Sequence, residues 1–282
     1  MNYIRLHFIY PSEQQELFIA ELLDMDFEGF EQESDLLIAS IPQHRFDDTK
    51  RESIERVMIM NHIEGGLIKE EVVEPQNWNQ QWEQTIKPQM IGEFLVHPTW
   101  DSVSDHNAEY EIKLDPKMAF GTGYHETTRL MLENMPGLVK KGSKVLDAGT
   151  GTGILAIASV MLGAESAFGF DIDEWSKDNA EENAGLNKVY EQCTFALGSI
   201  EVIPEGHSYD LILANINRNT LTDLLRHLIV HATKGARILL SGLLEQDEEM
   251  MLKVAEKCKL KHIQTHHKNE WIAVLFAYES SY

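Results

Sequence analysis

The most constraining feature of the sequence is a glycine-rich turn between a short apolar strand and a strongly apolar helix. Residues 144–147 have the pattern of a buried strand, Gly149, Gly151 and Gly153 follow, and the helical pattern begins at Ile154. Glycine lets the backbone turn sharply and lets a ligand approach where a Cβ atom would block it. Free N–H groups at the helix start favour an anionic ligand group, a phosphate or a carboxylate. A tight turn alone needs only one glycine, so the three indicate a ligand site.

The spacing of the three glycines narrows the class of ligand. The dinucleotide fingerprint is G-x-G-x-x-G, whereas here the third glycine comes one residue earlier. A Walker A loop needs Gly-Lys-Ser/Thr, which is absent. Asp147, just before the loop, fits poorly beside a pyrophosphate and well beside a ligand with an ammonium group and a positive sulfonium. The turn therefore predicts S-adenosylmethionine as cofactor, with Asp147, Gly149, Gly151 and Gly153 among the residues that bind it.

From about residue 121 onward, helix and strand patterns alternate, which is typical of a doubly wound parallel sheet of the α/β class. The last two predicted strands depart from this pattern, because only Lys268-Asn269-Glu270 separates them and a parallel crossover needs a longer connection. We expect these two strands to be antiparallel neighbours. The predicted strands cover residues 144–147, 167–171, 193–197, 209–214, 236–241, 261–267 and 271–278, and the predicted helices cover residues 125–135, 154–162, 176–187, 220–231 and 246–258.

The first 75 residues predict a small separate α+β domain. Their pattern is strand, helix, strand pair, helix and strand, which suggests a split βαβ module. No acid, base or ligand cluster with catalytic spacing occurs in them. The predicted elements cover residues 2–10, 13–24, 27–41, 47–60 and 68–74.

A polar segment follows, and we take residues 76–91 as a linker to a second domain of residues 92–282. Trp78 and Trp82 are four residues apart and therefore share a helix face. They either pack between the domains or grip a partner, and packing is the favoured interpretation because paired aromatics are mainly buried area. Two short strands, 93–96 and 110–114, are expected before the alternating pattern begins.

Charge and composition exclude several functional classes. The net charge of −22 argues against a nucleic-acid partner, which would need clustered Lys and Arg. Residues 1–75 hold six Lys and Arg against seventeen Asp and Glu, so half of the surplus negative charge lies in about a quarter of the chain. A basic protein would be attracted to this surface; the alternative is a solvated surface that only maintains solubility.

Neither the start of the sequence nor its apolar stretches indicate export or a membrane. We find no secretory signal and no stretch long enough to span a bilayer. Cys193 and Cys258 are far apart and form no CxxC pair, so neither a disulfide framework nor a zinc site is indicated. Paired histidines lack a third ligand, so no metal site is expected. A cytoplasmic location is the default expectation.

Two polar residues end predicted strands of the parallel sheet, where ligands of such sheets bind. Asp171 can accept both ribose hydroxyls of an adenosine; the alternative role is a helix N-cap, for which Asp173 is better suited. Asn215 ends the fourth strand, so its side chain should reach the methyl-transfer centre, although asparagine there is often only a turn residue. Both are predicted site residues.

A further loop, Gly121-Thr122-Gly123-Tyr124-His125-Glu126-Thr127-Thr128, precedes the first strand of this sheet. Its glycines and hydroxyls suit a flap that hydrogen-bonds the methionine end of the cofactor. The alternative is a plain loop whose helix is capped by Thr122. Whether His125 acts catalytically stays open at this point.

Four segments taken together resemble the bacterial ribosomal protein L11 methyltransferases. They are Ala119-Phe120-Gly121-Thr122-Gly123-x-His125-x-Thr127-Thr128, Asp147-x-Gly149-x-Gly151-x-Gly153-Ile154-Leu155, Gly169-x-Asp171-Ile172-Asp173 and Ala214-Asn215-Ile216, and they span about 100 residues. The segment with Trp78, Trp82 and Lys87-Pro88 is also similar to the interdomain region of that family.

The resemblance implies a class I methyltransferase with a seven-stranded sheet that binds S-adenosylmethionine. It also implies a small N-terminal domain that captures ribosomal protein L11, and cofactor contacts at Thr128, Gly149, Asp171 and Asn215. Asn217 departs from the family, which commonly has an aliphatic residue there, so it is a candidate for altering the substrate pocket.

The expected reaction is methylation of lysine side chains, N-terminal α-amines or both on L11, with Asn215 as the catalytic residue. Its side-chain carbonyl would accept hydrogen bonds from the amine and point the lone pair at the methyl group. Two alternatives are a class I N-methyltransferase acting on another protein or a small amine, and a non-catalytic protein that binds S-adenosylmethionine. The oligomeric state is not predicted.

Overall fold

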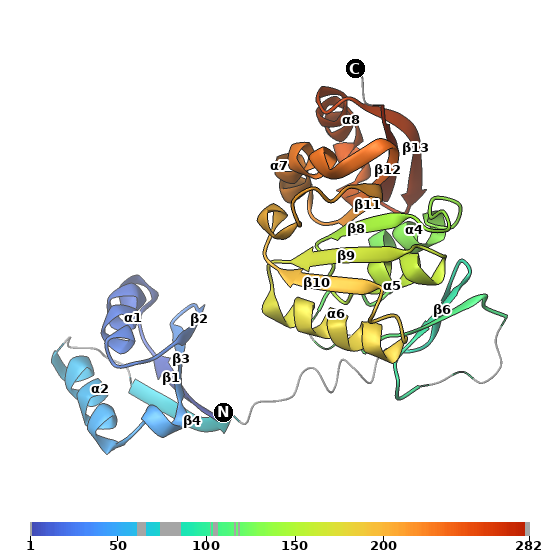
Figure 1. Cartoon of the computed structure of the whole chain (residues 1–282). Helices are drawn as coiled ribbons and strands as arrows, with labels where there is room; N and C mark the ends of the chain where they lie inside the picture. The colour runs from blue at the N-terminus through green and yellow to red at the C-terminus, as the bar shows by residue number, and fades with distance from the viewer. Residues whose placement is uncertain are drawn as a thin grey trace. The chain divides into compact units, whose positions relative to one another are not determined.

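The computed structural model describes residues 2–60, 66–73, 86–101, 103, 107–115, 117 and 119–279 (Figure 1). The chain divides into two compact units, Met1–Trp78 and Asn79–Tyr282. Trp78 and Trp82 of the predicted linker lie outside the described residues. No helix within the described ranges is long and apolar enough to cross a membrane.

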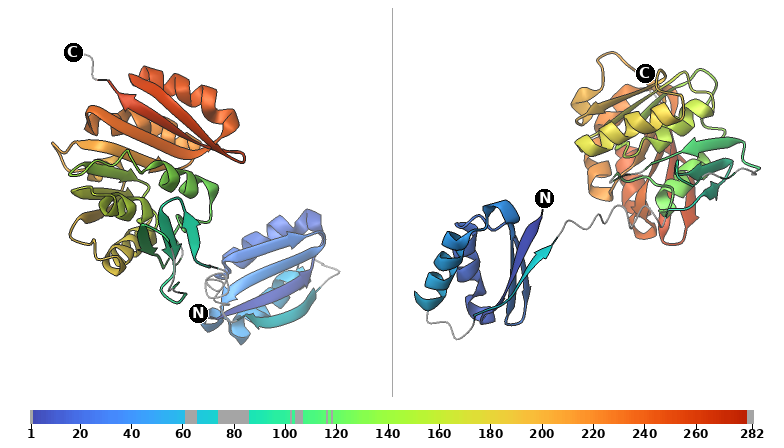
Figure 2. Two further views of the ribbon diagram at one scale, coloured as in Figure 1. Left: turned by 90° about the vertical axis from the view of Figure 1, so that its right-hand side faces the viewer. Right: turned by 90° about the horizontal axis from the view of Figure 1, so that it is seen from below.

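The small unit has the predicted split βαβ order, with both helices on one face of an antiparallel sheet (Figure 2). Inward residues of the first strand, such as Leu6 and Phe8, are buried against Phe18 and Leu22 of the first helix. The sheet order is β2-β3-β1-β4. The elements are β1 (Tyr3–Ile9), η1 (Ser12–Gln14), α1 (Gln15–Leu23), β2 (Gly29–Glu33), β3 (Leu36–Pro42), η2 (Gln43–Arg45), α2 (Asp48–Met60) and β4 (Gly66–Val73).

The large unit begins with a small three-stranded sheet formed by β5 (Gln89–Ile91), β6 (Phe94–His97) and β7 (Tyr110–Lys113). Strands β5 and β6 are antiparallel, while β6 and β7 are parallel. The side chains of Ile91, Phe94 and Ile112 are fully buried. Strand β5 lies inside the segment 76–91 that the sequence predicts as linker, because Ile91 is fully buried in this sheet and β5 pairs with β6.

The main sheet has seven strands in the order β10-β9-β8-β11-β12-β14-β13 (Figure 1). Strands β8, β9, β10, β11 and β12 are parallel, and β14 is antiparallel to both β12 and β13, so the predicted antiparallel end is confirmed. The strands are β8 (Lys144–Ala148), β9 (Ser166–Asp171), β10 (Cys193–Leu197), β11 (Tyr209–Asn215), β12 (Ala232–Leu244), β13 (Leu260–Lys268) and β14 (Trp271–Tyr278).

Helices bury both faces of this sheet, which makes it the class I methyltransferase arrangement expected from the sequence. Val145 of β8 belongs to an apolar cluster on one face, which includes residues of helices α4, α5 and α6. Its neighbour Leu146 belongs to the cluster on the other face, which includes residues of helices α7 and α8. Strands buried on both faces read as continuous apolar runs, which is why they were recognisable in the sequence. The helices are α4 (Glu126–Asn134), α5 (Ile154–Met161), α6 (Glu174–Leu186), η3 (Ile200–Val202), α7 (Arg218–Leu228), η4 (Ile229–His231), η5 (Glu245–Asp247) and α8 (Glu248–Lys257).

Candidate active site

A cavity of about 480 Å³ lies at the carboxyl ends of the parallel strands. This is the edge at which ligands of doubly wound sheets bind, because the strand-to-helix loops diverge there. Predicted site residues Gly149, Gly151, Asp171 and Asn215 belong to its lining. The whole lining consists of Phe120, His125, Thr127, Gly149, Gly151, Phe170, Asp171, Ile172, Ser176, Ser199, Asn215, Ile216, Asn217, Thr220, Leu224, Gly242 and Trp271.

The glycine turn needs glycine at each predicted position, but for different reasons. All three have positive φ, at +72°, +54° and +80° for Gly149, Gly151 and Gly153. A Cβ atom on Gly149 would lie 2.2 Å from Cγ2 of Ile216, and one on Gly151 would lie 2.3 Å from the carbonyl oxygen of Phe120. Gly153 does not line the cavity; its Cβ would meet Ala180 at 3.0 Å. Two glycines therefore shape the cavity, and the third lets α5 pack against α6.

Asp171 ends β9 and faces the cavity, while its neighbour Asp173 caps the next helix. The side chain of Asp173 accepts hydrogen bonds from the backbone N–H groups of Trp175 and Ser176, so the predicted division of roles is confirmed for Asp173. Asp171 Oδ2 accepts the N–H of Gly151 at 3.0 Å, and Oδ1 accepts the N–H of Asp173 at 3.1 Å. Each carboxylate oxygen keeps a second lone pair, so Asp171 is both oriented and able to accept hydroxyl groups of a ligand.

Asp147 lies beneath the turn rather than in the cavity wall. Its side chain is wholly buried, and Oδ2 accepts the hydroxyl of Thr150 at 2.7 Å. Oδ1 has no hydrogen-bond partner among the described residues. Burial raises the pKa of this carboxyl to about 7, against the lowering effects of the Thr150 hydroxyl and of the nearby backbone N–H of Ala156, and the charge of Asp171 raises it further. Asp147 thus holds the turn from inside.

Asn215 ends β11 at the centre of the cavity. Its Nδ2 donates to Oγ1 of Thr128 at 3.3 Å, while Oδ1 has no partner within the described part of the chain. Thr128, in the first turn of α4, is wholly buried and not part of the lining. Asn217, two residues further on, caps α7 by accepting the N–H of Thr220 at 3.0 Å, which accounts for a polar residue at this position.

His125, rather than Thr122, caps helix α4, so the alternative role considered for Thr122 is wrong. Nδ1 of His125 accepts the backbone N–H of Thr127 at 3.3 Å and lies 2.8 Å from its hydroxyl. The Thr122 hydroxyl accepts the N–H of Tyr124 instead. A histidine imidazole can replace the usual hydroxyl because Nδ1 is a hydrogen-bond acceptor, and contacts with the rings of Phe120 and Trp271, which sequence spacing does not reveal, hold the imidazole in place.

Seven residues of the lining are not named in the sequence analysis, and Gly242 and Trp271 are two of them; the others are Phe170, Ser176, Ser199, Thr220 and Leu224. Gly242, with a φ of +84°, lies where β12 passes Ile216, and a Cβ atom there would come within 2.2 Å of the Ile216 carbonyl oxygen. Trp271 begins β14, and because β14 is antiparallel, its first residue lies beside the last residues of the parallel strands. The antiparallel pair predicted at residues 261–267 and 271–278 contained part of the signal for Trp271, since a strand that runs against its neighbours starts where they end; which neighbour it pairs with was not predicted.

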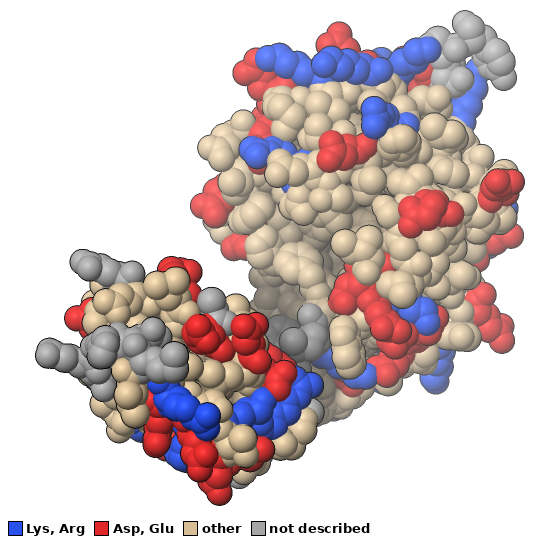
Figure 3. Space-filling model, turned by 90° about the vertical axis from the view of Figure 1, so that its left-hand side faces the viewer, with Lys and Arg blue, Asp and Glu red and all other residues tan. Residues whose placement is uncertain are grey.

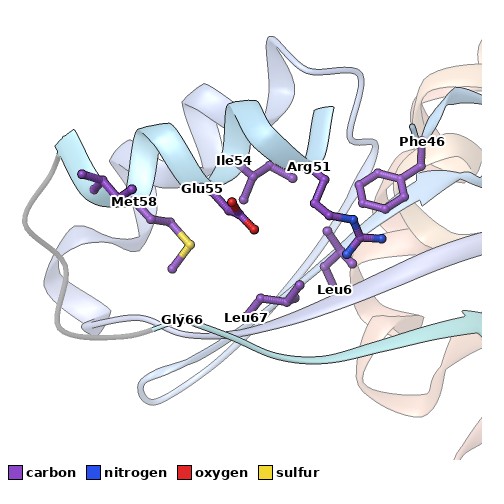
Figure 4. A pocket seen from close by; sticks show the side chains of 9 residues that line it. Leu6, Phe46, Arg51, Ile54, Glu55, Met58, Gly66 and Leu67 are labelled. Atoms are coloured by element: carbon purple, nitrogen blue, oxygen red, sulfur yellow. The ribbon is translucent and has the colours of Figure 1, made fainter. Parts of the chain in front are cut away.

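The small unit has a hollow of its own, of about 430 Å³, between α2 and strands β1 and β4 (Figure 4). Leu6 and Ile54 supply buried apolar surface to it. The guanidinium of Arg51 lies 5.1 Å from the centre of the Phe46 ring and pairs with Glu70 at 2.6 Å. This hollow is therefore of mixed polarity: apolar side chains line it together with Glu55 and with Arg51, whose charge Glu70 neutralises. Within the described residues of both units, no group of His, Cys, Asp and Glu is arranged to hold a metal ion.

Comparison with known proteins identifies the family. The family model for ribosomal protein L11 methyltransferase (PrmA) matches residues 10–279. The ribosomal protein L11 methyltransferase of Chlorobaculum parvum is 35% identical over 97% of this chain and 96% of its own length. That of Porphyromonas gingivalis is 35% identical over 94% of this chain and 91% of its own.

A solved structure agrees with this result. The crystal structure of ribosomal protein L11 methylase from Lactobacillus delbrueckii subsp. bulgaricus superimposes with a TM-score of 0.64 at 28% identity, and the match covers 69% of this chain and 100% of that chain. Sequence, fold and cavity lead to one conclusion: the chain belongs to the ribosomal protein L11 methyltransferase family.

Proposed function

We propose that this chain transfers methyl groups from S-adenosylmethionine to amino groups of ribosomal protein L11, on lysine side chains, the N-terminal α-amine or both. The observation that carries the choice of an amine is Asn215. Asn215 lines the cavity, its amide nitrogen is engaged by Thr128, and its amide oxygen is buried without a partner among the described residues, so an approaching ligand must displace neighbouring atoms slightly to reach it. A hydrogen-bond acceptor at this position suits an incoming N–H group.

The residues of the cavity fit S-adenosylmethionine. Gly149 and Gly151 line the cavity, and each must be glycine because a Cβ atom would collide with Ile216 or with the Phe120 carbonyl oxygen; the turn is therefore packed tightly and presents backbone to the ligand in place of side chains. Asp171 is held by two backbone N–H groups and keeps lone pairs for ribose hydroxyls. When bound, this cofactor supplies a methyl group on a positively charged sulfur, which makes the methyl carbon electrophilic.

Three of the predicted cofactor-binding residues would act through those that line the cavity. Thr128 orients Asn215, and Asp147 holds Thr150 of the turn through the hydroxyl hydrogen bond. Gly153 lets α5 start close to Ala180 of α6. We propose these three as positioning residues, and Gly149, Gly151, Asp171 and Asn215 as residues that contact the cofactor.

The chain's part in the reaction is mainly alignment. Asn215 Oδ1 would accept an N–H of the amine and so point its lone pair along the line of attack. Apolar side chains of the lining, including Ile216 and Leu224, disfavour a charged ammonium and lower the pKa of the amine toward the neutral form. No side chain has to act as a strong base, because a neutral amine is already the nucleophile.

We also propose that the small unit recognises L11, that the predicted linker, shortened to residues 76–88 by strand β5, connects it to the catalytic unit, and that the protein acts in the cytoplasm without binding nucleic acid directly. Charge supports this division. All six Lys and Arg of residues 1–75 have an acidic partner within 4 Å, so eleven carboxylates remain in excess (Figure 3). Such a surface attracts a basic protein and repels a phosphate backbone.

Mass spectrometry of methylated L11 tests the proposal. The full chain is incubated with purified L11 and S-adenosylmethionine carrying a labelled methyl group, and the labelled peptides of L11 are mapped. We expect label on amine-bearing residues, and none with Asp171→Ala. Label in a cell lysate but not on L11 would favour another protein or a small amine as substrate. Cofactor binding without transfer to any component of the lysate would favour a non-catalytic role.

A further inference from the structure

The order of the strands lays out the parts of the cavity in a row. Asp171 ends β9, Asn215 ends β11 two strands away, and Trp271 begins β14 two strands further in the same direction. Neighbouring strands are about 4.8 Å apart, so each of these two intervals is about 10 Å across the sheet. The second is longer, because the register sets Trp271 opposite Leu244 of β12 and Asn215 opposite Ser241. A nucleoside anchored at Asp171 with its reactive group at Asn215 occupies the first interval. The interval between Asn215 and Trp271 is left for the second substrate.

Aromatic rings form the wall of this second interval. The ring of His125 is 4.7 Å from that of Trp271, at an interplanar angle of 69°, and 5.5 Å from that of Phe120. All three belong to the lining of the cavity. His125 is fixed by its hydrogen bonds to Thr127. Phe120 is 54% exposed, so much of its surface is available to a ligand.

The position of Trp271 is set by the turn between β13 and β14, which is tied to α4. Lys268 Nζ pairs with Glu133 at 2.8 Å, and Nδ2 of Asn269 donates to Oε1 of Glu126 at 3.2 Å. These two contacts join residues more than a hundred positions apart in the sequence. They bring Trp271 of the hairpin against His125, which stands at the start of the same helix.

We propose that Trp271, with Phe120 and His125, forms the wall that receives the carbon chain of the amine being methylated, and that the hairpin turn positions it. This inference rests on the proposed function. Aromatic faces pack well on methylene groups and attract an ammonium or methylated ammonium group at their centre. Asn215 then meets the nitrogen at the far end of the chain. The ligand class is an unbranched alkyl chain ending in an amine, such as a lysine side chain.

Peptide binding to the full chain tests this wall without depending on the identity of the protein substrate. The chain is saturated with S-adenosylhomocysteine and titrated by calorimetry with a short peptide containing one lysine, and with the same peptide containing norleucine. We expect Trp271→Ala to weaken lysine-peptide binding on the order of tenfold, and Trp271→Phe to retain most of it. Trp100→Ala, a 48% exposed tryptophan outside the cavity, is the matched control and should bind like the unchanged chain.

The affinity for S-adenosylhomocysteine, measured in the same preparations, reports folding and distinguishes the two ends of the cavity. It should be the same in all four proteins. Equal lysine-peptide affinity of Trp271→Ala and the unchanged chain, or no saturable binding to the unchanged chain, overturns the inference. A parallel fall in S-adenosylhomocysteine affinity also overturns it, because the wall would then belong to the cofactor. A chain that binds the lysine peptide as expected but does not methylate L11 refutes the proposed function alone.

Discussion

The two units of this methyltransferase differ in how their surfaces are built. In the large unit the shape of the cavity is sensitive to single added atoms. A Cβ atom at Gly149 would collide with the side chain of Ile216, and one at Gly151 with the carbonyl oxygen of Phe120. In the small unit, the basic side chains are neutralised by neighbours and a general excess of carboxylates remains. Function in the large unit should therefore respond to single substitutions and little to salt, whereas the small unit should show the opposite behaviour.

The largest expected effect is that of Gly151→Ala. The new Cβ would lie 2.3 Å from the Phe120 carbonyl oxygen, and the residue keeps a φ of +54° that alanine adopts reluctantly. Overpacking and left-handed strain together should lower the free energy of unfolding by about 4 kcal/mol. Affinity for S-adenosylhomocysteine should fall at least about 100-fold, since the wall must move. Denaturant unfolding and calorimetry measure the two effects.

Gly235→Ala is the matched control for this substitution. Gly235 also has a positive φ, of +82°, but a Cβ there would meet nothing within 4 Å. Only the backbone strain of about 1 kcal/mol should appear, with unchanged cofactor affinity. Equal losses in the two variants would show that the glycine turn is limited by its backbone conformation and not by the opposite wall.

The second effect concerns pH and the buried carboxyl of Asp147. Its pKa is raised from the ordinary 3.8 to about 7, chiefly by burial, so the native state holds this proton more tightly than the unfolded chain. The stability that the protonated group contributes is complete below about pH 4 and is lost as the pH rises through 7. The difference in unfolding free energy between Asp147→Asn and the unchanged chain should thus shift in favour of the variant by about 3 kcal/mol from pH 5 to pH 8.

Glu71 of the small unit provides the contrast to Asp147. Hydrogen bonds from Lys69 and then His7 lower the pKa of this half-buried carboxyl to about 2. Its own charge is therefore complete throughout pH 5 to 8, and the stability difference of Glu71→Gln should change across that range only through the lost pairing with His7, by much less than that of Asp147→Asn. A pH-independent difference for Asp147→Asn would mean that Asp147 is already ionised in the native protein.

The third effect is on turnover. Asn215→Ala removes the amide oxygen proposed to orient the amine, and kcat toward L11 should fall on the order of 100-fold, as it does when a single orienting hydrogen bond is lost from an active site. The affinity for S-adenosylhomocysteine should change much less, because Asp171 and the glycine turn remain. Asn219→Ala, an exposed asparagine outside the cavity lining, is the control. An unchanged kcat for Asn215→Ala under saturating conditions would remove Asn215 from the reaction.

The sequence predicted those residues of the site that stand at the ends of the parallel strands. The apolar runs of β8, β9 and β11 are buried on both faces of the sheet, so their ends, and hence Asp171 and Asn215, could be located from hydrophobicity alone. The three glycines of the turn could be located in the same way, because they lie between the apolar strand β8 and the apolar helix α5. Here local pattern and tertiary structure agree.

The parts that could not be predicted depend on contacts between distant segments. Sequence spacing does not show that Ile216 passes within 2.2 Å of the Cβ position of Gly242, or that the ring of His125 meets Trp271. The burial of Asp147 likewise depends on how α5 starts. The sequence predicted that Asp147 binds the cofactor, whereas the structure places its side chain beneath the glycine turn and outside the cavity lining. Local propensity carries no information on these approaches.

The smallest expected effect is that of charge on the small unit, and it is the one that tests the comparison most directly. Removing four exposed carboxylates that form no ion pair within 4 Å among the described residues should raise the KM for L11 by about fivefold and leave kcat unchanged, because exposed charges guide a basic partner but contribute little individually. The effect should vanish in high salt, where the screening length falls to about 3 Å. The substitutions are Glu16→Gln, Glu21→Gln, Glu33→Gln and Glu55→Gln.

A matched set in the large unit decides whether position or total charge matters. It removes the same number of exposed carboxylates, away from the cavity, with Glu165→Gln, Glu191→Gln, Glu205→Gln and Glu256→Gln. If both sets raise KM equally, the protein attracts L11 through its net charge of −22 and the small unit has no special share. If only the first set raises KM, the excess carboxylates of the small unit form a docking surface for L11. The small unit would then attract the substrate electrostatically, and the rigid cavity of the large unit would align it.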